Sequence, residues 1–338
     1  MAHTTISKVA FIGTGIMGSA IARHILDAGY RLAVYNRTPE KADALVAAGA
    51  VRAASIAEAV RHADVVFTMV GNPEDVEDVY LAGDGILANA RKGAWLIDLT
   101  TSSPDLARDI SEAAEVADLH AFDCPVTGGE QGAIDGTLTL IIGAEEGSLP
   151  EQIEELLACF SAKRCYFGHA GAGQTAKLCN QVSFASCIVG YADALALAEQ
   201  AGLDSHAVLD LILSGTGTSG AASSYAPKSL AGDYKAGFFA EYLRKDLGLA
   251  LAHSEDFGLT LPGAETAYAL YDVLCQIGGA RLGGQAITLL YSDEADGIAA
   301  GVDWSRAQQD EGDECDCDDD CCCGHLHDGD GCCGHHAH

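Results

Sequence analysis

One stretch near the N-terminus, Lys8-Val-Ala-Phe-Ile-Gly13-Thr-Gly15-Ile-Met-Gly18, decides how the chain folds. Its first five residues form an apolar, β-rich run that predicts a strand. Residues 19–28 have helical spacing and end at Gly29, so they predict a helix. A second apolar run, residues 31–35, predicts another strand. Strand, glycine-rich turn, helix and strand in this order are typical of a unit that binds a dinucleotide.

The three glycines of the turn each have a physical role at this spacing. Gly13 permits the tight turn, Gly15 lets the backbone approach a pyrophosphate, and Gly18 lets the helix pack closely on the strand. Ile16 and Met17 lie between the second and third glycines. There the first backbone N–H groups of the helix and the positive end of its dipole can bind phosphates. We therefore predict that all five residues contact a dinucleotide.

The end of the second strand indicates which nicotinamide dinucleotide binds. An NAD site usually has Asp or Glu about 20 residues after the glycines, where the carboxylate binds the ribose hydroxyls. This chain has Asn36, Arg37 and Thr38 instead. Asn36 removes a carboxylate that would repel a 2′-phosphate, Arg37 can pair with this phosphate, and Thr38 can donate a hydrogen bond. The sequence therefore predicts NADP in preference to NAD.

The pattern of strands and helices divides the chain into three parts. Short apolar runs at 65–70, 95–99 and 138–142 alternate with helical segments, which predicts a mostly parallel sheet covered by helices. Helix formers dominate from Gly173 onward. The predicted fold is α/β: an N-terminal Rossmann-type doubly wound sheet plus an all-α C-terminal domain. We place an NADP-binding domain at 1–168, a helical domain for substrate and oligomer contacts at 169–306, and a disordered tail at 307–338.

The tail is acidic and rich in side chains that bind metals. The chain has 19 basic and 49 acidic residues, a net charge of −30, and ten of the acids lie in residues 307–338, which contain no Lys or Arg. Seven of the 13 cysteines also lie there. Thiolates and imidazoles bind Zn, Ni and Cu(I) well, although the spacing is not that of a closed structural zinc site. The candidate ligands are Cys315, Cys317, Cys321, Cys322, Cys323, His325, His327, Cys332, Cys333, His335 and His336.

The composition excludes some partners and favours one compartment. A chain of this charge lacks the basic footprint that nucleic-acid binding requires, so no nucleic-acid partner is expected. The six other cysteines are scattered without the spacing of a disulfide framework, which favours the reducing cytosol. The N-terminus shows no signal peptide, and the longest apolar region, residues 182–198, is short for a membrane span. We expect a cytoplasmic protein without a membrane partner.

Four separated motifs follow one another over residues 8–300. After the glycine turn come Asp123-Cys-Pro-Val-Thr-Gly-Gly129, then Gly171-Ala-Gly-Gln-Thr-Ala-Lys-Leu-Cys-Asn-Gln181, and then Lys245-Asp-Leu247. In this order they resemble the motifs of the β-hydroxyacid dehydrogenase family, the relatives of 3-hydroxyisobutyrate dehydrogenase. The resemblance implies hydride transfer between a nicotinamide cofactor and a small β-hydroxyacid or its semialdehyde.

The resemblance implies that Lys177 is the central catalytic residue, and the chemistry agrees. Oxidation of a carbinol requires a base for the hydroxyl proton, and the reverse reaction requires an acid. Lys177 lies near the start of a predicted long helix, where the helix dipole and burial both lower the pKa of a lysine. We therefore predict that Lys177 is the general acid and base.

Two amides follow Lys177 on the same helical face. Asn180 and Gln181 lie three and four residues after it, so either amide can orient the lysine or bind the substrate. The family often has Asn at the fourth position, where this chain has Gln181. Both residues are therefore candidates for the catalytic group.

Three residues of the second motif are candidates for binding the substrate. Thr127 carries a hydroxyl that can donate a hydrogen bond, and Gly128 and Gly129 expose backbone N–H groups to a carboxylate. The family more often has Ser in place of Thr127, and the extra methyl group narrows the predicted pocket.

Two further residues are candidate cofactor contacts from their positions in the family pattern. Thr101 follows the strand predicted at 95–99 and is expected on the nicotinamide side. Lys245 is expected beside the nicotinamide or the substrate.

Two other functions are alternatives. Imine reductases resemble the same fold but usually lack the lysine, and a metal-handling protein would act through the tail. Lys177 and the intact glycine turn favour the dehydrogenase. The sequence does not choose among 3-hydroxyisobutyrate, tartronate semialdehyde, succinic semialdehyde and sulfonate analogues. The apolar helices after Gly173, together with the family pattern, predict a homodimer or homotetramer.

Overall fold

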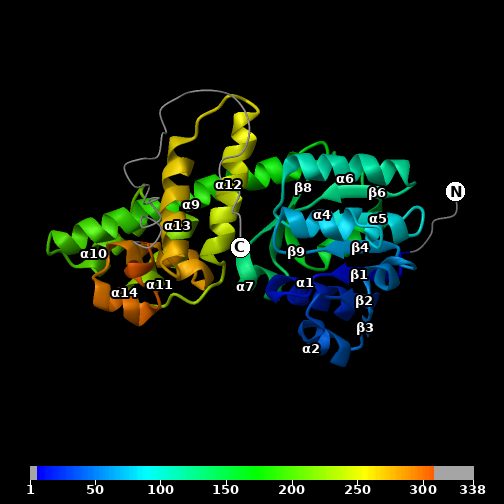
Figure 1. Cartoon of the computed structure of the whole chain (residues 1–338), viewed down its shortest axis with the longest axis horizontal. Coiled ribbons are helices and arrows are strands. Elements are labelled where there is room, and N and C mark those ends of the chain that lie inside the picture. Colours follow the sequence, from blue (N-terminus) through cyan, green and yellow to red (C-terminus); the bar gives the residue numbers. More distant parts are fainter. Residues whose placement is uncertain (1–5, 308–338) are drawn as a thin grey trace, which may run out of the picture.

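The computed structural model describes residues 6–307 of the chain. Its N-terminal part is built on a six-stranded parallel sheet in the order β3-β2-β1-β4-β5-β6 (Figure 1). The strands are β1 (Lys8–Ile12), β2 (Arg31–Tyr35), β3 (Val51–Arg52), β4 (Val65–Thr68), β5 (Trp95–Asp98) and β6 (His120–Asp123). The strand order reverses between β1 and β4, and in such sheets ligands bind at the carboxyl ends of the strands at this point.

A second, smaller sheet completes the N-terminal domain. In it β7 (Val126–Thr127) is antiparallel to β8 (Leu138–Ile142), and β8 is parallel to β9 (Ser161–Tyr166). The helices of this domain are α1 (Ile16–Asp27), η1 (Pro39–Ala42), α2 (Asp43–Ala47), α3 (Ile56–Val60), α4 (Pro73–Leu81), α5 (Ile86–Asn89), α6 (Pro104–Val116), α7 (Gly129–Ile134) and α8 (Glu151–Ala158).

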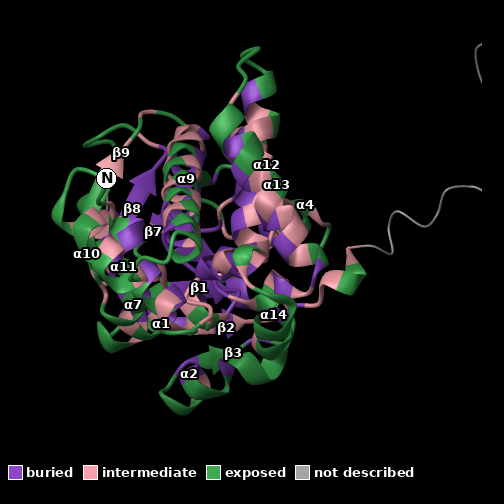
Figure 2. Ribbon diagram, turned by 90° about the vertical axis from the view of Figure 1, so that its left-hand side faces the viewer, coloured by how far each residue is buried: buried purple, intermediate pink, exposed green. Residues whose placement is uncertain are grey.

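Both faces of the large sheet are covered by apolar side chains. Along β1, Val9 and Phe11 belong to one buried cluster and Ala10 and Ile12 to another, because successive strand residues point to opposite faces. The first cluster includes side chains of α1, α8 and the small sheet, and the second includes side chains of α3, α4, α5 and α6. The central strands are accordingly buried (Figure 2).

The C-terminal part is dominated by helices. They are α9 (Ala172–Gln200), α10 (Ser205–Ser214), α11 (Gly220–Leu230), α12 (Ala240–Glu255), α13 (Pro262–Gln276), η2 (Gly279–Arg281), η3 (Gly284–Tyr291), α14 (Glu294–Ala300) and η4 (Trp304–Arg306). A third buried cluster, which includes Ile188, Leu243 and Tyr271, forms their core. In Figure 1, α9 extends from the large sheet past α12 and α13 to α10, so one helix joins both parts.

Helix α9 is long and apolar enough to cross a membrane by length and composition alone. Its most apolar 18-residue window has a mean hydropathy of 1.4, and 39% of that window is buried. A core helix meets the same criteria. Here α9 packs against α11, α12 and α13, and its side chains Ile188 and Leu195 belong to the third cluster.

The fold class predicted from the sequence is confirmed by the parallel sheet and the helical C-terminal part. Strands β6 and β9 were not predicted, because His120 at the start of β6 is exposed and Lys163 and Arg164 interrupt β9 with exposed charges. The predicted boundary between residues 168 and 169 lies between β9 and α9.

Candidate active site

The glycine turn has no room for a side chain at two of its three glycines. A Cβ atom on Gly13, whose φ is +96°, would lie 2.1 Å from the carbonyl oxygen of Met69. A Cβ atom on Gly18 would lie 2.1 Å from the carbonyl oxygen of Gly13. At Gly15 a Cβ atom would meet no atom within 4 Å. The turn therefore packs tightly against the protein at Gly13 and Gly18 and leaves open space at Gly15. This open space fits a pyrophosphate that approaches the backbone there.

Helix α1 begins directly after this turn. Gly15 is its N-cap residue, and no side chain of the described chain caps this end. The first backbone N–H groups of the helix, including those of Ile16, Met17 and Gly18, therefore have no acceptor within the helix and can bind an anion at the turn. The structure thus brings the five predicted residues of the turn together at one helix end.

Asn36 and Arg37 lie at the carboxyl end of β2. The Oδ1 atom of Asn36 accepts a hydrogen bond from the Thr14 N–H group at 2.9 Å, and its Nδ2 atom donates to the Thr38 carbonyl oxygen at 2.8 Å. The Arg37 side chain is 86% exposed and lies 3.1 Å from the Asp75 carboxylate. Because an exposed ion pair contributes little stability, the guanidinium can exchange this carboxylate for a phosphate.

Lys177 is buried in α9, and burial lowers the pKa of its ammonium group to about 8. A charged amine loses its hydration inside the protein, so the neutral form is favoured. The neighbouring Asp246 raises the pKa of Lys177, and Lys245 lowers it. Lys177 lies beyond the first turn of α9, where the helix dipole acts weakly. Burial is therefore the largest cause of the low pKa, and the helix start, which the sequence suggested as a second cause, contributes little at this position.

A chain of polar contacts runs from Lys177 to the loop after β5. Lys177 Nζ donates to Gln181 Oε1 at 2.9 Å, and Gln181 Nε2 donates to Asp246 Oδ2 at 2.6 Å. Lys245 Nζ lies 3.2 Å from Asp246 Oδ1 and donates to the Thr101 carbonyl oxygen at 2.6 Å. The structure therefore gathers four of the predicted residues around Asp246, which is fully buried.

The two amides that follow Lys177 have different surroundings. The Gln181 oxygen accepts from both Lys177 and Asn180, the latter at 2.8 Å, while its nitrogen donates to Asp246. Gln181 is buried and Asn180 is half-buried. In this geometry Gln181 orients the lysine, and Asn180 is the more accessible amide.

Three further polar residues were missed from the sequence, although all lie in the motifs quoted above. They are Asp123, Gln174 and Asp246, each at most 2% exposed. Asp123 accepts hydrogen bonds from the N–H groups of Gly171 and Gln174, both at 2.7 Å, and so binds the start of α9. They could have been identified from the sequence, because each is an acidic or amide residue inside a glycine-rich or apolar motif.

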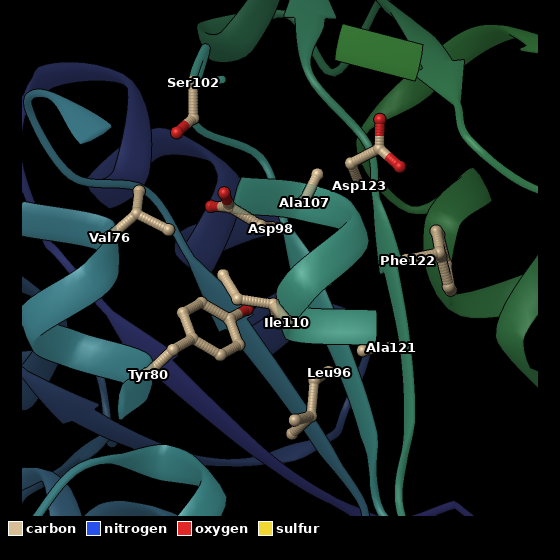
Figure 3. Close-up of a pocket in the computed structure, with 10 residues that line it drawn as sticks. All are labelled: Val76, Tyr80, Leu96, Asp98, Ser102, Ala107, Ile110, Ala121, Phe122 and Asp123. Carbon is tan, nitrogen blue, oxygen red and sulfur yellow. The ribbon is translucent and has the colours of Figure 1, made fainter. Parts of the chain in front are cut away.

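A small cavity lies behind the loop after β5. Its volume is about 10 Å³, at the lower limit for one water molecule, so it is too small for a hydroxyacid. Figure 3 shows Tyr80, Asp98 and Ser102 among its lining residues. Burial raises the pKa of Asp98 to about 6, and Asp98 Oδ1 accepts from the Thr68 hydroxyl at 2.7 Å. The Ser102 hydroxyl is buried without a partner in the described chain.

The predicted substrate residues lie at the start of α7. Thr127 ends β7, and Gly128 and Gly129 have φ values of +131° and +65°. Gly129 is the first residue of α7, which Figure 1 places close to the junction of the two parts. Among residues 6–307 no hydrogen bond joins this segment directly to Lys177. The structure thus places the segment beside β8, where a Cβ atom on Gly128 would lie 3.1 Å from the Leu138 side chain, without a hydrogen bond to the lysine.

The candidate metal ligands of the tail, from Cys315 to His336, lie outside the described residues. Within residues 6–307, no three His, Cys, Asp or Glu side chains are grouped so that they could hold a metal ion. The six cysteines of this part are free thiols.

Both parts of the chain match families of known proteins that bind a nicotinamide dinucleotide. Residues 8–171 match the NAD-binding domain of 6-phosphogluconate dehydrogenase, and residues 171–291 match the NAD-binding domain of NADP-dependent 3-hydroxyisobutyrate dehydrogenase. The oxidoreductase YkwC of Bacillus subtilis is 41% identical over 283 residues, which are 84% of this chain and 98% of YkwC. An NAD-dependent L-serine dehydrogenase of Pseudomonas aeruginosa is 36% identical, over 81% of this chain and 94% of that protein.

A solved structure shares both domains. The structure of 3-hydroxyisobutyrate dehydrogenase from Mycobacterium tuberculosis with L-serine is 32% identical, with a TM-score of 0.78. The match covers 85% of this chain and all of that one. A dinucleotide-binding sheet followed by a helical domain defines an NAD(P)-binding oxidoreductase. Within this class, the chain belongs to the β-hydroxyacid dehydrogenase family, with 3-hydroxyisobutyrate dehydrogenase among its relatives.

Proposed function

We propose that this protein is an NADP-preferring dehydrogenase that interconverts a small β-hydroxyacid and its semialdehyde, with Lys177 as general acid and base. The observation that carries the proposal is the buried Lys177, whose pKa is lowered to about 8. A general acid or base acts best when its pKa lies near the working pH. Contacts through Gln181, Asp246 and Lys245 connect this lysine to the loop at the end of β5, which supports the proposal.

The residues of this chain divide the chemistry among them. The glycine turn would hold the pyrophosphate of a nicotinamide dinucleotide, which when bound would supply the acceptor or donor of the hydride. In oxidation, neutral Lys177 Nζ accepts the proton of the substrate hydroxyl, and in reduction the ammonium form returns a proton to the oxygen. Gln181 Oε1 fixes the direction of Nζ. The backbone N–H groups of Gly128 and Gly129 bind the substrate carboxylate in this proposal.

Names of the relatives support the substrate class. The similar proteins include one named for L-serine and one named for 3-hydroxyisobutyrate, and both compounds carry a hydroxyl group β to a carboxylate. The small residues Thr127, Gly128 and Gly129 suit a short acid of this kind.

The test is a turnover assay with a panel of substrates and both cofactors. The panel contains L-serine, 3-hydroxyisobutyrate, tartronate semialdehyde, succinic semialdehyde, a sulfonate analogue and a cyclic imine. Turnover of at least one hydroxyacid or semialdehyde, with a higher kcat/KM for the NADP pair, supports the proposal. Reduction of the imine alone would favour an imine reductase, and Lys177 is the residue that argues against this outcome. No turnover of any compound would favour a metal-handling role for the tail.

Arg37→Ala is expected to weaken NADPH binding by about 1–3 kcal/mol, the scale of a lost hydrogen bond to a charged group. The affinity for NADH should change little, because NADH has no 2′-phosphate. Titration of both cofactors by fluorescence measures the difference. Arg23→Ala is the matched control, since Arg23 is an exposed arginine of the same domain that pairs with Asp27. Equal losses for both cofactors would remove the argument for phosphate recognition.

The rate should depend on pH through Lys177. In oxidation kcat/KM should rise with pH to a plateau above about 8, the pKa of Lys177, because the neutral amine is the base. In reduction kcat/KM should fall above the same pH. Asp246→Asn should move both midpoints to lower pH, because the Asp246 charge raises the pKa of Lys177.

Lys245→Met provides the opposite case. The Lys245 charge lowers the pKa of Lys177, so its removal should move the midpoints to higher pH. Identical midpoints in the wild type and both variants would contradict the assignment of this titration to Lys177.

We extend the proposal to three features of the whole chain. The exposed Leu197, Leu203 and Leu211 near the end of α9 and in α10 support a homodimer or homotetramer. The metal-binding role of the tail rests on its Cys and His content alone. The cytoplasmic location remains a prediction from the sequence.

A further inference from the structure

Side chains of the helical part hold three consecutive backbone groups of the loop after β5. Gln174 Nε2 donates to the Thr100 carbonyl oxygen at 2.8 Å, and Gln174 Oε1 accepts from the Ser102 N–H group at 3.0 Å. Lys245 Nζ donates to the carbonyl oxygen of Thr101, which lies between them. The conformation of this loop is therefore coupled to α9 and α12.

Gln174 itself is held firmly on both sides. Its side chain is fully buried, and both ends of its amide are hydrogen-bonded to the loop. Its backbone N–H group donates to Asp123 Oδ2 at 2.7 Å. Because Gln174 precedes Lys177 by three residues in α9, the two side chains lie on neighbouring positions of one helical face. One helical turn therefore joins the loop to the lysine.

The position of the loop in the sheet indicates which half of the cofactor it faces. A dinucleotide lies across the carboxyl ends of the strands at the point where the strand order reverses. Asn36 and Arg37, at the end of β2, belong to the side that binds the ribose of the adenosine half. The loop after β5 lies on the other side of β1 and β4. It therefore faces the nicotinamide half.

We propose that Gln174 is a positioning residue that fixes the loop of residues 100–102, and with it the nicotinamide, relative to Lys177. The inference rests on the proposed function, because it assumes hydride transfer beside Lys177. Hydride transfer and proton transfer occur at the same carbinol group, so the nicotinamide and the lysine need a fixed separation. A misplacement of about 1 Å between reacting groups can lower a rate by about 10²-fold.

A matched control separates positioning from a general effect of losing a buried amide. Gln285 is also fully buried, and its Nε2 atom donates to the carbonyl oxygens of Asp233 and Lys235 at 2.9 and 3.0 Å. These contacts lie within the helical part and do not involve the loop of residues 100–102. Gln285→Met therefore removes the same kind of side chain without changing the loop.

The kinetic test compares Gln174→Met and Gln285→Met with the wild type. Gln174→Met is expected to lower kcat by about 10- to 100-fold, with an increased primary isotope effect from 4-deuterated nicotinamide, because hydride transfer becomes slower. The KM for the hydroxyacid should change less than kcat, and Gln285→Met should keep the kcat of the wild type. A normal kcat and isotope effect in Gln174→Met, with wild-type turnover present, would overturn the proposal.

A second measurement does not depend on activity. Hydrogen exchange of the Ser102 amide, followed by mass spectrometry without cofactor and with NADP⁺, should be slow in the wild type and in Gln285→Met. It should become faster in Gln174→Met, because the acceptor Oε1 is lost. Fast exchange of Ser102 in the folded wild type would overturn the proposal even if the variant failed to fold. Slow exchange in an enzyme that turns over no hydroxyacid would mean that the proposed function has failed while the loop contact remains.

Discussion

Lys177→Ala is expected to lower kcat by about 10²- to 10⁴-fold, the contribution of general acid–base catalysis. The affinity for the cofactor should not change, because the predicted phosphate contacts lie at the glycine turn and at the end of β2. Steady-state kinetics with the best substrate of the panel, together with a cofactor titration, measures both quantities. The dependence of the rate on a group with a pKa of about 8 should disappear in the same variant.

Lys92→Ala is the control for this variant. Lys92 is 81% exposed and pairs with Asp118 on the surface, so its removal should leave kcat unchanged. Turnover of Lys177→Ala near the wild-type level would mean that another group moves the proton.

Gly15→Ala is expected to leave the protein folded but to weaken both cofactors by about 1–3 kcal/mol, the typical cost of forcing an extra methyl group into a packed contact. No atom of the protein lies within 4 Å of the added Cβ, so the melting temperature should stay close to that of the wild type. The methyl group would occupy the space where the pyrophosphate approaches the backbone. Calorimetric titration with NADPH and NADH, after a thermal melt, tests both parts.

Substitutions at two other glycines are controls for Gly15→Ala. Gly190→Ala places a methyl group in open space within α9, so it should leave cofactor affinity unchanged and raise the melting temperature slightly, because alanine favours a helix interior more than glycine does. Gly13→Ala should lower the melting temperature strongly, because its Cβ atom would lie 2.1 Å from a backbone oxygen at a φ of +96°. Unchanged cofactor affinity in a folded Gly15→Ala variant would show that the pyrophosphate does not pass over this glycine.

The sequence predicted the parts of the fold that repeat a simple pattern. The strands at 8–12 and 31–35 have the predicted bounds, because continuous or alternating apolar runs end at the glycine turn and at polar residues. β9 was missed because it lies at the edge of its sheet, where a strand can have few buried apolar side chains. Its Lys163 and Arg164 are exposed, so the segment has no apolar pattern. The two-residue strands β3 and β7 contain too few side chains to form a pattern of their own.

The sequence predicted those site residues whose role follows from the residue type and its place in a motif. The glycines of the turn were named from their chemistry and spacing, and Lys177 was named from the resemblance to the family, with which its chemistry agrees. Asp246 and Gln174 were not named, because their roles depend on partners 65 and 72 residues away in the sequence, which only the folded chain brings into contact. The division of roles between Asn180 and Gln181 also required the direction of each side chain.

The attachment of α9 to Asp123 has a consequence for how such a chain can evolve. The start of the helix completes the hydrogen bonds of a carboxylate that is buried at the end of β6, while later residues of the helix belong to the third buried cluster. A gene fragment ending before residue 171 would remove both of these backbone donors, so the end of β6 would lose two hydrogen bonds to its carboxylate. Recombination between relatives is therefore tolerated best when α9 is inherited together with the sheet, and the remaining helices can then diverge around it.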